Sequence, residues 1–155
     1  MSCDPEKPLV PNSEPYIHIV HIFAASPDDL FDAWLQPNLL RRWMSFTGDG
    51  GAQDVIANHR VGGLFWIRER DGAALRDRYG EYHSIERPRR LVFSLHVPEH
   101  FPGTTCVNVS LAPGPNGTVM SFIHTGVRNG PVEATWRRMF DRLAESLECR
   151  TESSK

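Results

Sequence analysis

The seven histidines are the side chains of this sequence best suited to bind a metal or move a proton. His18 and His21 are three residues apart in an alternating segment, and this spacing places them on opposite faces of a strand. His96 and His100 are four residues apart, but Pro98 between them excludes the helix that an HExxH zinc site needs. The sequence therefore predicts no metal site.

Patterns for covalent catalysis and for phosphate binding are also absent. There is no GxSxG elbow, and no cysteine stands in a recognisable arrangement with a histidine. Gly48, Gly50 and Gly51 lack the GK[ST] ending of a phosphate-binding loop, and the neighbouring Asp49 would repel a phosphate. From motifs alone we therefore expect no catalytic residue and no cofactor.

The charge of the chain argues against a nucleic-acid partner. Its 17 basic and 19 acidic residues give a formal net charge of −2, whereas a nucleic-acid-binding protein usually has a strongly basic face. Arg137 and Arg138 are followed at helical spacing by Asp141 and Glu145, which predicts an internally paired, solvated helix face. A surface that docks a partner is the alternative interpretation of such arginines.

The length of 155 residues fits a single domain. We expect disordered ends at 1–15, which contains four prolines, and at 151–155, with one domain over 16–150. The first residues lack the basic and apolar regions of a signal peptide, and no run approaches the roughly 18 apolar residues of a membrane span. These features predict a cytoplasmic protein without stable membrane insertion.

Apolar periodicity and turn residues predict one strand, two short helices, six strands and one long helix, in that order. Ser26 and Pro27 begin the first helix, Pro37 begins the second, and Gly130-Pro131 begins a third of about 18 residues with a continuous apolar stripe. Strands are expected at 16–23, 53–57, 64–70, 76–86, 90–97, 104–112 and 118–125.

This order of elements predicts an α+β fold. An antiparallel sheet of seven strands cannot bury its inner face with strands alone, and only the C-terminal helix is long enough to cover it. We therefore expect a curved seven-stranded antiparallel sheet that grips the long helix. Such an arrangement often leaves a hollow between sheet and helix, where ligands bind.

Six segments between residues 16 and 148 carry a family resemblance: ASPDDLFDAW (25–34), LLRRWM (39–44), RVGG (60–63), YGEYHSIERPRRLVFS (79–94), GTVMSFIHTG (117–126) and TWRRMFDRLAESLE (135–148). Together they resemble the SRPBCC superfamily of START-like, helix-grip proteins, and within it the group named after the heat-shock chaperone ATPase activator. Two positions depart from the family pattern. Met44 replaces a second tryptophan, which would reshape the mouth of a pocket, and Asn58-His59 replace a segment that commonly holds an aspartate.

The resemblance implies a hydrophobic cavity between the sheet and the C-terminal helix. By similarity to the family we place these residues on its wall: Trp43, Phe65, Ile67, Tyr82, Phe93, Leu95, Met120, Phe122, His124, Trp136, Met139 and Phe140. The alternative is that they fill a solid core. His124 would then be a histidine hydrogen-bonded inside the core, rather than a group that orients a ligand or transfers a proton. Tyr82 and Tyr79 would either supply hydroxyls to the cavity or lie at its rim.

Three functions are compatible with this reading. The first is a binding protein that encloses a small hydrophobic or amphipathic molecule. The second is an enzyme of the polyketide cyclase or hydrolase kind, in which His124 or Tyr82 would move protons. The third is a chaperone partner that activates an ATPase, which we disfavour because the eukaryotic activators have an additional domain for which 155 residues leave no room. A homodimer is a further possible assembly.

Overall fold

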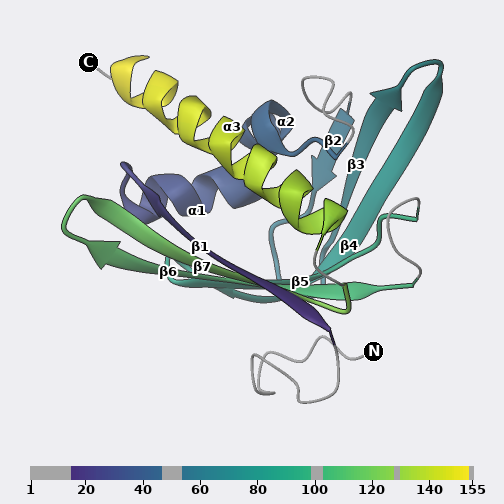
Figure 1. Ribbon diagram of the computed structural model, residues 1–155, viewed down its shortest axis with the longest axis horizontal. Helices are drawn as coiled ribbons and strands as arrows, with labels where there is room; N and C mark the ends of the chain where they lie inside the picture. Colours follow the sequence, from purple (N-terminus) through teal and green to yellow (C-terminus); the bar gives the residue numbers. More distant parts are fainter. Residues whose placement is uncertain (1–14, 47–53, 99–102, 128–129, 154–155) are drawn as a thin grey trace.

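The computed structural model describes residues 15–46, 54–98, 103–127 and 130–153 (Figure 1). Residues 1–14 of the expected disordered start lie outside this range. The elements are β1 (Tyr16–Phe23), α1 (Pro27–Leu35), α2 (Pro37–Trp43), β2 (Asp54–Ala57), β3 (Leu64–Asp71), β4 (Ala74–Glu86), β5 (Arg90–Leu95), β6 (Thr105–Gly114), β7 (Gly117–Thr125) and α3 (Pro131–Ser153). The predicted order of elements is confirmed, and strand bounds differ from the prediction by two residues at most.

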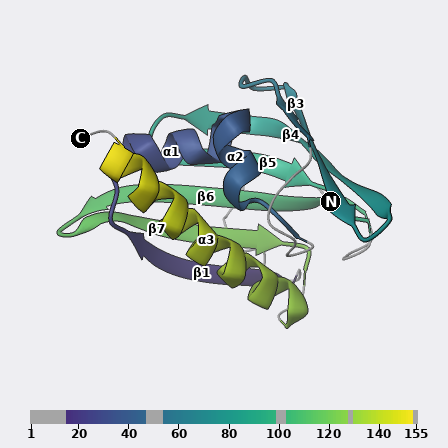
Figure 2. The same ribbon diagram turned by 90° about the horizontal axis from the view of Figure 1, so that it is seen from above.

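The strands form one antiparallel sheet in the order β1-β7-β6-β5-β4-β3-β2. Each strand from β2 to β7 pairs with its neighbour in sequence, and β1 closes the far edge against β7. Figures 1 and 2 show the sheet curving around α3, with α1 and α2 on the same face. The α+β helix-grip fold predicted from the sequence is therefore confirmed.

Local sequence signals explain where the helices begin. The Ser26 hydroxyl accepts a hydrogen bond of 3.2 Å from the Asp29 amide, and Pro27 occupies the first turn of α1. Pro37 begins α2, which has only seven residues and no side-chain hydrogen bond at its N-cap. Helix α3 has 23 residues, longer than predicted, and includes 151–153, where we expected a disordered tail.

The β3–β4 hairpin bends away from the rest of the sheet (Figure 1). Within it, Gly80 of β4 is the cross-strand partner of Phe65. A Cβ atom at this position would clash with the carbonyl oxygen of Ser94 and would lie 2.7 Å from the ring of Phe65. A side chain there would force β4 away from β5. Further along β4, the pairing with β5 has a register shift between Tyr82 and Ser84.

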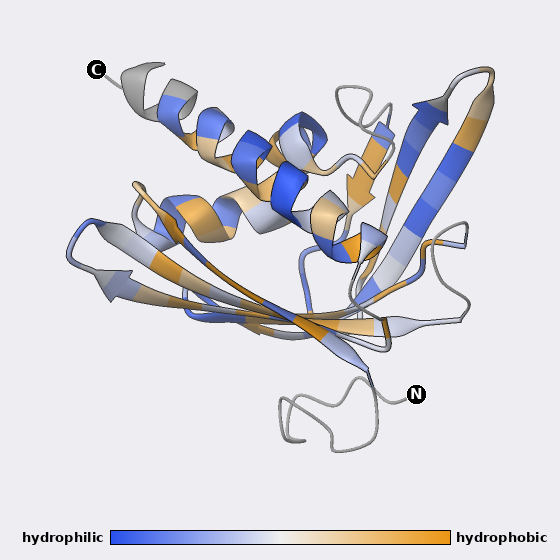
Figure 3. Cartoon of the chain, in the orientation of Figure 1, coloured by the Kyte–Doolittle hydropathy of each residue, from blue (hydrophilic) through white to orange (hydrophobic). Residues whose placement is uncertain are grey.

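The core lies between the inner face of the sheet and the three helices. In Figure 3 the side of α3 turned toward the sheet is hydrophobic, and its opposite side is largely hydrophilic. The polar face is internally paired, as the sequence predicted, but with a different acid: the Arg137 Nε atom lies 3.0 Å from Glu133, one turn earlier. Glutamate four residues before a basic residue is the favoured orientation of such a pair.

A fully buried ion pair joins the inner face of the hairpin to the end of α2. Arg78 Nη2 lies 2.8 Å from Glu69 Oε2, and neither side chain has exposed area. The amide of Phe46, three residues after α2, donates to Glu69 Oε1 at 2.7 Å. Burial raises the pKa of Glu69, while Arg78 and the Phe46 amide oppose the rise.

Replacing the acid alone is therefore expected to be worse than replacing both partners. Glu69→Leu removes the carboxylate that lies against the buried Arg78 guanidinium and should lower the free energy of unfolding by about 3–5 kcal/mol. Adding Arg78→Met removes the buried positive charge as well and should restore part of that loss. Urea denaturation of the three proteins measures this, and a double variant less stable than Glu69→Leu would contradict the expectation.

Candidate functional site

The interior contains a small cavity between α1, α2 and strands β3, β4 and β5. Its volume is about 10 Å³, and it is lined by Trp34, Leu40, Met44, Phe65, Ile67, Tyr82, Phe93 and Leu95. A space of this size holds one water molecule at most. Five of the twelve residues that we predicted for a ligand-binding wall line it: Phe65, Ile67, Tyr82, Phe93 and Leu95.

The other seven predicted residues are fully buried but do not line this cavity: Trp43, Met120, Phe122, His124, Trp136, Met139 and Phe140. They pack closely against one another between α3 and the sheet. The ring of Phe122 lies 4.5 Å from that of Trp136 and 5.1 Å from that of Phe140, measured between centroids. Their assignment to a ligand-binding wall stays a prediction.

Three residues of the cavity wall were not predicted: Trp34, Leu40 and Met44. Trp34 and Leu40 lie on the apolar faces of α1 and α2, and nothing in their spacing separates a cavity wall from ordinary core. Met44 stands where the family pattern has a second tryptophan. The one sequence signal for this wall was therefore that departure from the family pattern.

Trp34 has a buried polar atom without a partner. Its side chain is 2 % exposed, and its indole nitrogen has no hydrogen-bond acceptor within the described residues. The other two tryptophans of the core are satisfied, because Trp43 donates to the Ala33 carbonyl at 2.9 Å and Trp136 donates to His124 at 3.0 Å. A buried donor without an acceptor costs about 1–3 kcal/mol, so the Trp34 N–H is a place where a ligand atom would add stability.

The Tyr82 hydroxyl is the second polar group of the wall. The side chain is 2 % exposed, and burial raises the pKa of its phenol, which therefore stays protonated. Tyr79, three residues earlier on the same strand, is 46 % exposed on the opposite face. The two tyrosines therefore do not share one space, and Tyr82 alone faces the interior.

His124 lies in the core within a chain of hydrogen bonds. The Trp136 indole N–H donates to His124 Nδ1 at 3.0 Å, and His124 Nε2 lies 2.7 Å from the Thr105 hydroxyl oxygen. That hydroxyl donates to the Leu95 carbonyl at 2.9 Å. With the Thr105 proton directed at Leu95, the Nε2–H tautomer of a neutral His124 satisfies every bond in the chain.

This environment favours the neutral form of His124. Burial lowers its pKa from 6.5 to about 3. A proton on Nδ1 would also point at the Trp136 N–H, so two donors would face each other and the hydrogen bond between them would be lost. Near neutral pH the imidazole is therefore a structural hydrogen-bonding group, as in the alternative interpretation of the sequence, and its role as a ligand-binding residue stays a prediction.

The pH dependence of stability tests this state. Folded His124 stays neutral down to about pH 3, whereas in the unfolded chain it takes up a proton below about pH 6.5. Its contribution to stability is therefore complete above pH 6.5 and is lost as the pH falls. Between pH 6.5 and 5 the wild type should lose about 2 kcal/mol more than His124→Gln, in which an amide can accept from Trp136 and donate to Thr105.

Urea denaturation of both proteins at several pH values, with the His124 ring followed by NMR, makes this measurement. Equal pH dependence in the two proteins, or an imidazole that titrates near pH 6.5 in the folded state, would contradict a neutral buried His124.

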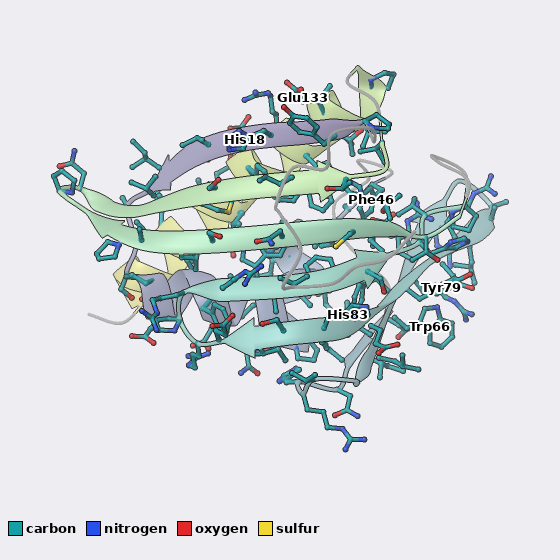
Figure 4. The ribbon with its side chains drawn as sticks, turned by 90° about the horizontal axis from the view of Figure 1, so that it is seen from below. His18, Phe46, Trp66, Tyr79, His83 and Glu133 are labelled. Atoms are coloured by element: carbon teal, nitrogen blue, oxygen red, sulfur yellow. The ribbon has the colours of Figure 1, made fainter. Side chains whose placement is uncertain are left out.

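The histidines of β1 lie on opposite faces, as the sequence spacing predicted. His18 is exposed and lies 3.1 Å from the Ser121 hydroxyl, on the face seen in Figure 4, whereas His21 stacks on Phe23 at 4.3 Å. Across the described ranges, no group of three or more His, Cys, Asp or Glu side chains is placed to hold a metal ion. Nor does any helix in those ranges have the length and apolarity to span a bilayer.

Solved structures share this fold. A protein from Nitrosomonas europaea, NE0264, is 17% identical with a TM-score of 0.74, over 91% of this chain and 99% of its own. SA2116 from Staphylococcus aureus, described as a protein of unknown function, is 18% identical with a TM-score of 0.76, over 90% and 97%. An AHSA1-like protein from Aeromonas hydrophila is 23% identical with a TM-score of 0.74, over 88% and 94%.

A comparison with curated proteins found no match. The family model described as "Activator of Hsp90 ATPase homolog 1-like protein" matches residues 24–148, a range that begins just after β1 and ends within α3. The chain therefore belongs to the family of Activator of Hsp90 ATPase homolog 1-like proteins, within the SRPBCC/START-like superfamily.

Proposed function

We propose that the protein binds a small, mostly apolar molecule with a hydrogen-bond acceptor, in the interior between the sheet and the helices. The observation that carries this proposal is that Trp34, whose indole N–H has no acceptor within the described residues, lines the interior cavity. A carbonyl or ether oxygen of a ligand placed beside it would supply the missing acceptor.

The composition of the wall favours a neutral ligand. Apart from the Trp34 N–H and the Tyr82 hydroxyl, the side chains that line the cavity are apolar, and none of them is charged. An ion would lose its hydration there without gaining a counter-charge. The Tyr82 hydroxyl can donate or accept, so it would bind a second polar atom of the same molecule.

Room for such a ligand would come from the α2 side of the cavity. Leu40 lies in α2, and Met44 directly follows it. This helix is the shortest of the three and has no side-chain hydrogen bond at its N-cap. Methionine is unbranched and adapts readily to a changed space. Opening this wall has a free-energy cost that lowers the apparent affinity, as for any pocket that forms on binding.

A larger ligand would extend past Trp34 toward the remaining predicted residues. The Trp34 ring lies 6.0 Å from Phe93 on the cavity side and 6.2 Å from both Phe122 and Trp136 on the α3 side. Binding without chemistry fits the state of His124, whose two ring nitrogens are engaged and whose pKa of about 3 disfavours proton transfer at neutral pH.

Acetophenone and ethylbenzene form a matched pair of probes, since the ketone adds one acceptor to a similar shape. Trp34→Phe removes the indole N–H and keeps an aromatic ring. We expect it to weaken acetophenone binding about fivefold, the value of one hydrogen bond of ~1 kcal/mol, with little change for ethylbenzene. NMR titration of methyl signals around the cavity gives both affinities.

Trp43→Phe is the control, because the Trp43 N–H already has the Ala33 carbonyl as its acceptor. It should change the two affinities by the same factor. If neither compound shifts signals of the cavity residues, or if Trp34→Phe leaves the ratio of affinities unchanged, the proposal is wrong.

The size of the side chain at position 44 provides a second test. Met44→Ala should enlarge the cavity, lower the free energy of unfolding by about 2–5 kcal/mol and strengthen binding of both probes. Met44→Trp, which introduces the residue of the family pattern, should fill the space and weaken both. Denaturation with and without probe measures these effects; tighter binding by Met44→Trp would place the ligand elsewhere.

A further inference from the structure

Exposed apolar side chains gather on the outer face of the β2–β3–β4 part of the sheet. The strand register places Ile56, Trp66, Tyr79 and His96 in one row across four neighbouring segments. Ile56 is 59 % exposed, Trp66 37 % and Tyr79 46 %, and Leu64 beside them is 64 % exposed. Figure 4, which views the sheet from the side opposite the helices, shows Trp66 and Tyr79 close together on this face.

A groove of about 530 Å³ lies along this row. Its wall includes Leu64, Trp66, Asp77, Tyr79, Glu81 and His96. The volume is within the range of sites for small molecules. Phe65 borders both this groove and the interior cavity. The side chains named above lie on the outer face of the hairpin, away from the helices, so the inference is argued from them alone and does not depend on the proposed function.

Trp66 and Tyr79 are the two aromatic side chains on the outer face of the hairpin that line the groove. Trp66 and Tyr79 are direct cross-strand partners, yet each ring packs against another neighbour. The guanidinium carbon of Arg68 lies 4.6 Å from the centroid of the Trp66 ring, and the Tyr79 and His96 rings are 4.8 Å apart. One face of the Trp66 ring is therefore covered by a cation of the protein itself, and a ligand would contact the rest of this ring and the ring of Tyr79.

The charges of the wall are acidic. Asp77 is paired with Arg68 at 2.9 Å, and this hydrogen bond lowers the pKa of the carboxyl. Glu81 lies opposite Leu64, and no side-chain ion pair joins it to another described residue. The wall residues in the described ranges include no lysine or arginine, which disfavours phosphates and nucleic acids.

From these observations we propose that the groove binds a small organic cation of the alkylated ammonium type. Its charged head would lie against the rings of Trp66 and Tyr79, with the Glu81 carboxylate as its counter-ion. Its apolar part would contact Leu64. A methylated ammonium suits such a site better than a bare one, because its weaker hydration makes contact with aromatic rings less costly.

Choline and 3,3-dimethylbutan-1-ol are a suitable pair of probes, since they have the same shape and differ in charge. Titrations at millimolar concentration would follow the four tryptophan indole signals of ¹⁵N-labelled protein, with that of Trp66 assigned by its loss in Trp66→Leu. Choline should shift the Trp66 signal and leave that of Trp34 in place. Its affinity should exceed that of the neutral alcohol by about tenfold.

Two substitutions locate the binding. Glu81→Gln should weaken choline binding about three- to tenfold and leave the affinity of the alcohol unchanged. Glu145→Gln, which removes the same charge from the exposed face of α3, should leave both affinities unchanged. Because Glu81 is only partly buried, Glu81→Gln is expected to fold, and its spectrum provides the check.

Three results would overturn the proposal. Equal affinity for choline and the alcohol would show that charge is not recognised, and an unshifted Trp66 signal would show that the groove is not the site. Sedimentation that reveals a dimer dissociated by Trp66→Leu would assign this face to contact between copies of the chain. Loss of acetophenone binding with choline binding retained would affect only the interior site.

Discussion

The hydrogen-bond chain from Trp136 to Leu95 fixes how the C-terminal helix lies on the sheet. It begins on α3, passes through His124 on β7 and Thr105 on β6, and ends at the Leu95 carbonyl on β5. Apolar contacts alone tolerate small shifts of a helix across a sheet, whereas a buried donor moved off its acceptor incurs a desolvation cost. These hydrogen bonds therefore favour one position of α3 on the sheet. The aromatic packing around Phe122 and Phe140 depends on that position.

This constraint divides the interior into two parts. Beneath α3, satisfied polar groups and closely packed rings leave little freedom. Beneath α2, the cavity is lined by Met44 and by the unpartnered N–H of Trp34, and the helix above it is short. The cavity thus lies on the α2 side of the core, and the series of hydrogen bonds ends at its wall, at Leu95. The proposed ligand would bind on this side.

The fold could be predicted because its determinants are local. Alternation in β1 and β7, the prolines at the helix starts and the apolar stripe of α3 all lie within short segments, and they were sufficient for the order of elements. The cavity could not be predicted in the same way. Burial of Phe65 or Phe122 follows from strand phase, but which of them borders a space depends on how side-chain volumes from distant segments fit together.

The sequence also could not predict which buried polar groups have hydrogen-bond partners. Trp34, Trp43 and Trp136 look alike in the sequence, and only the placement of acceptors on other elements separates the two satisfied indoles from the unsatisfied one. Similarly, Arg137 has acids at helical spacing on both sides, and spacing alone did not predict that it would select Glu133. The choice between several acids on one helix, like the position of acceptors on other elements, depends on the three-dimensional arrangement and not on periodicity alone.

Both candidate sites depend on the β3–β4 hairpin and on the close approach of Gly80 to Ser94. The inner face of the β3–β4 hairpin supplies Phe65 and Tyr82 to the interior cavity, and its outer face supplies Trp66 and Tyr79 to the groove. Strand alternation separates these two sets, so one hairpin can provide opposite chemistries: a neutral, enclosed wall inside and an acidic, aromatic surface outside. The hairpin holds this position because Gly80 lets β4 approach Ser94, and because the buried Glu69–Arg78 pair joins its inner face to the end of α2.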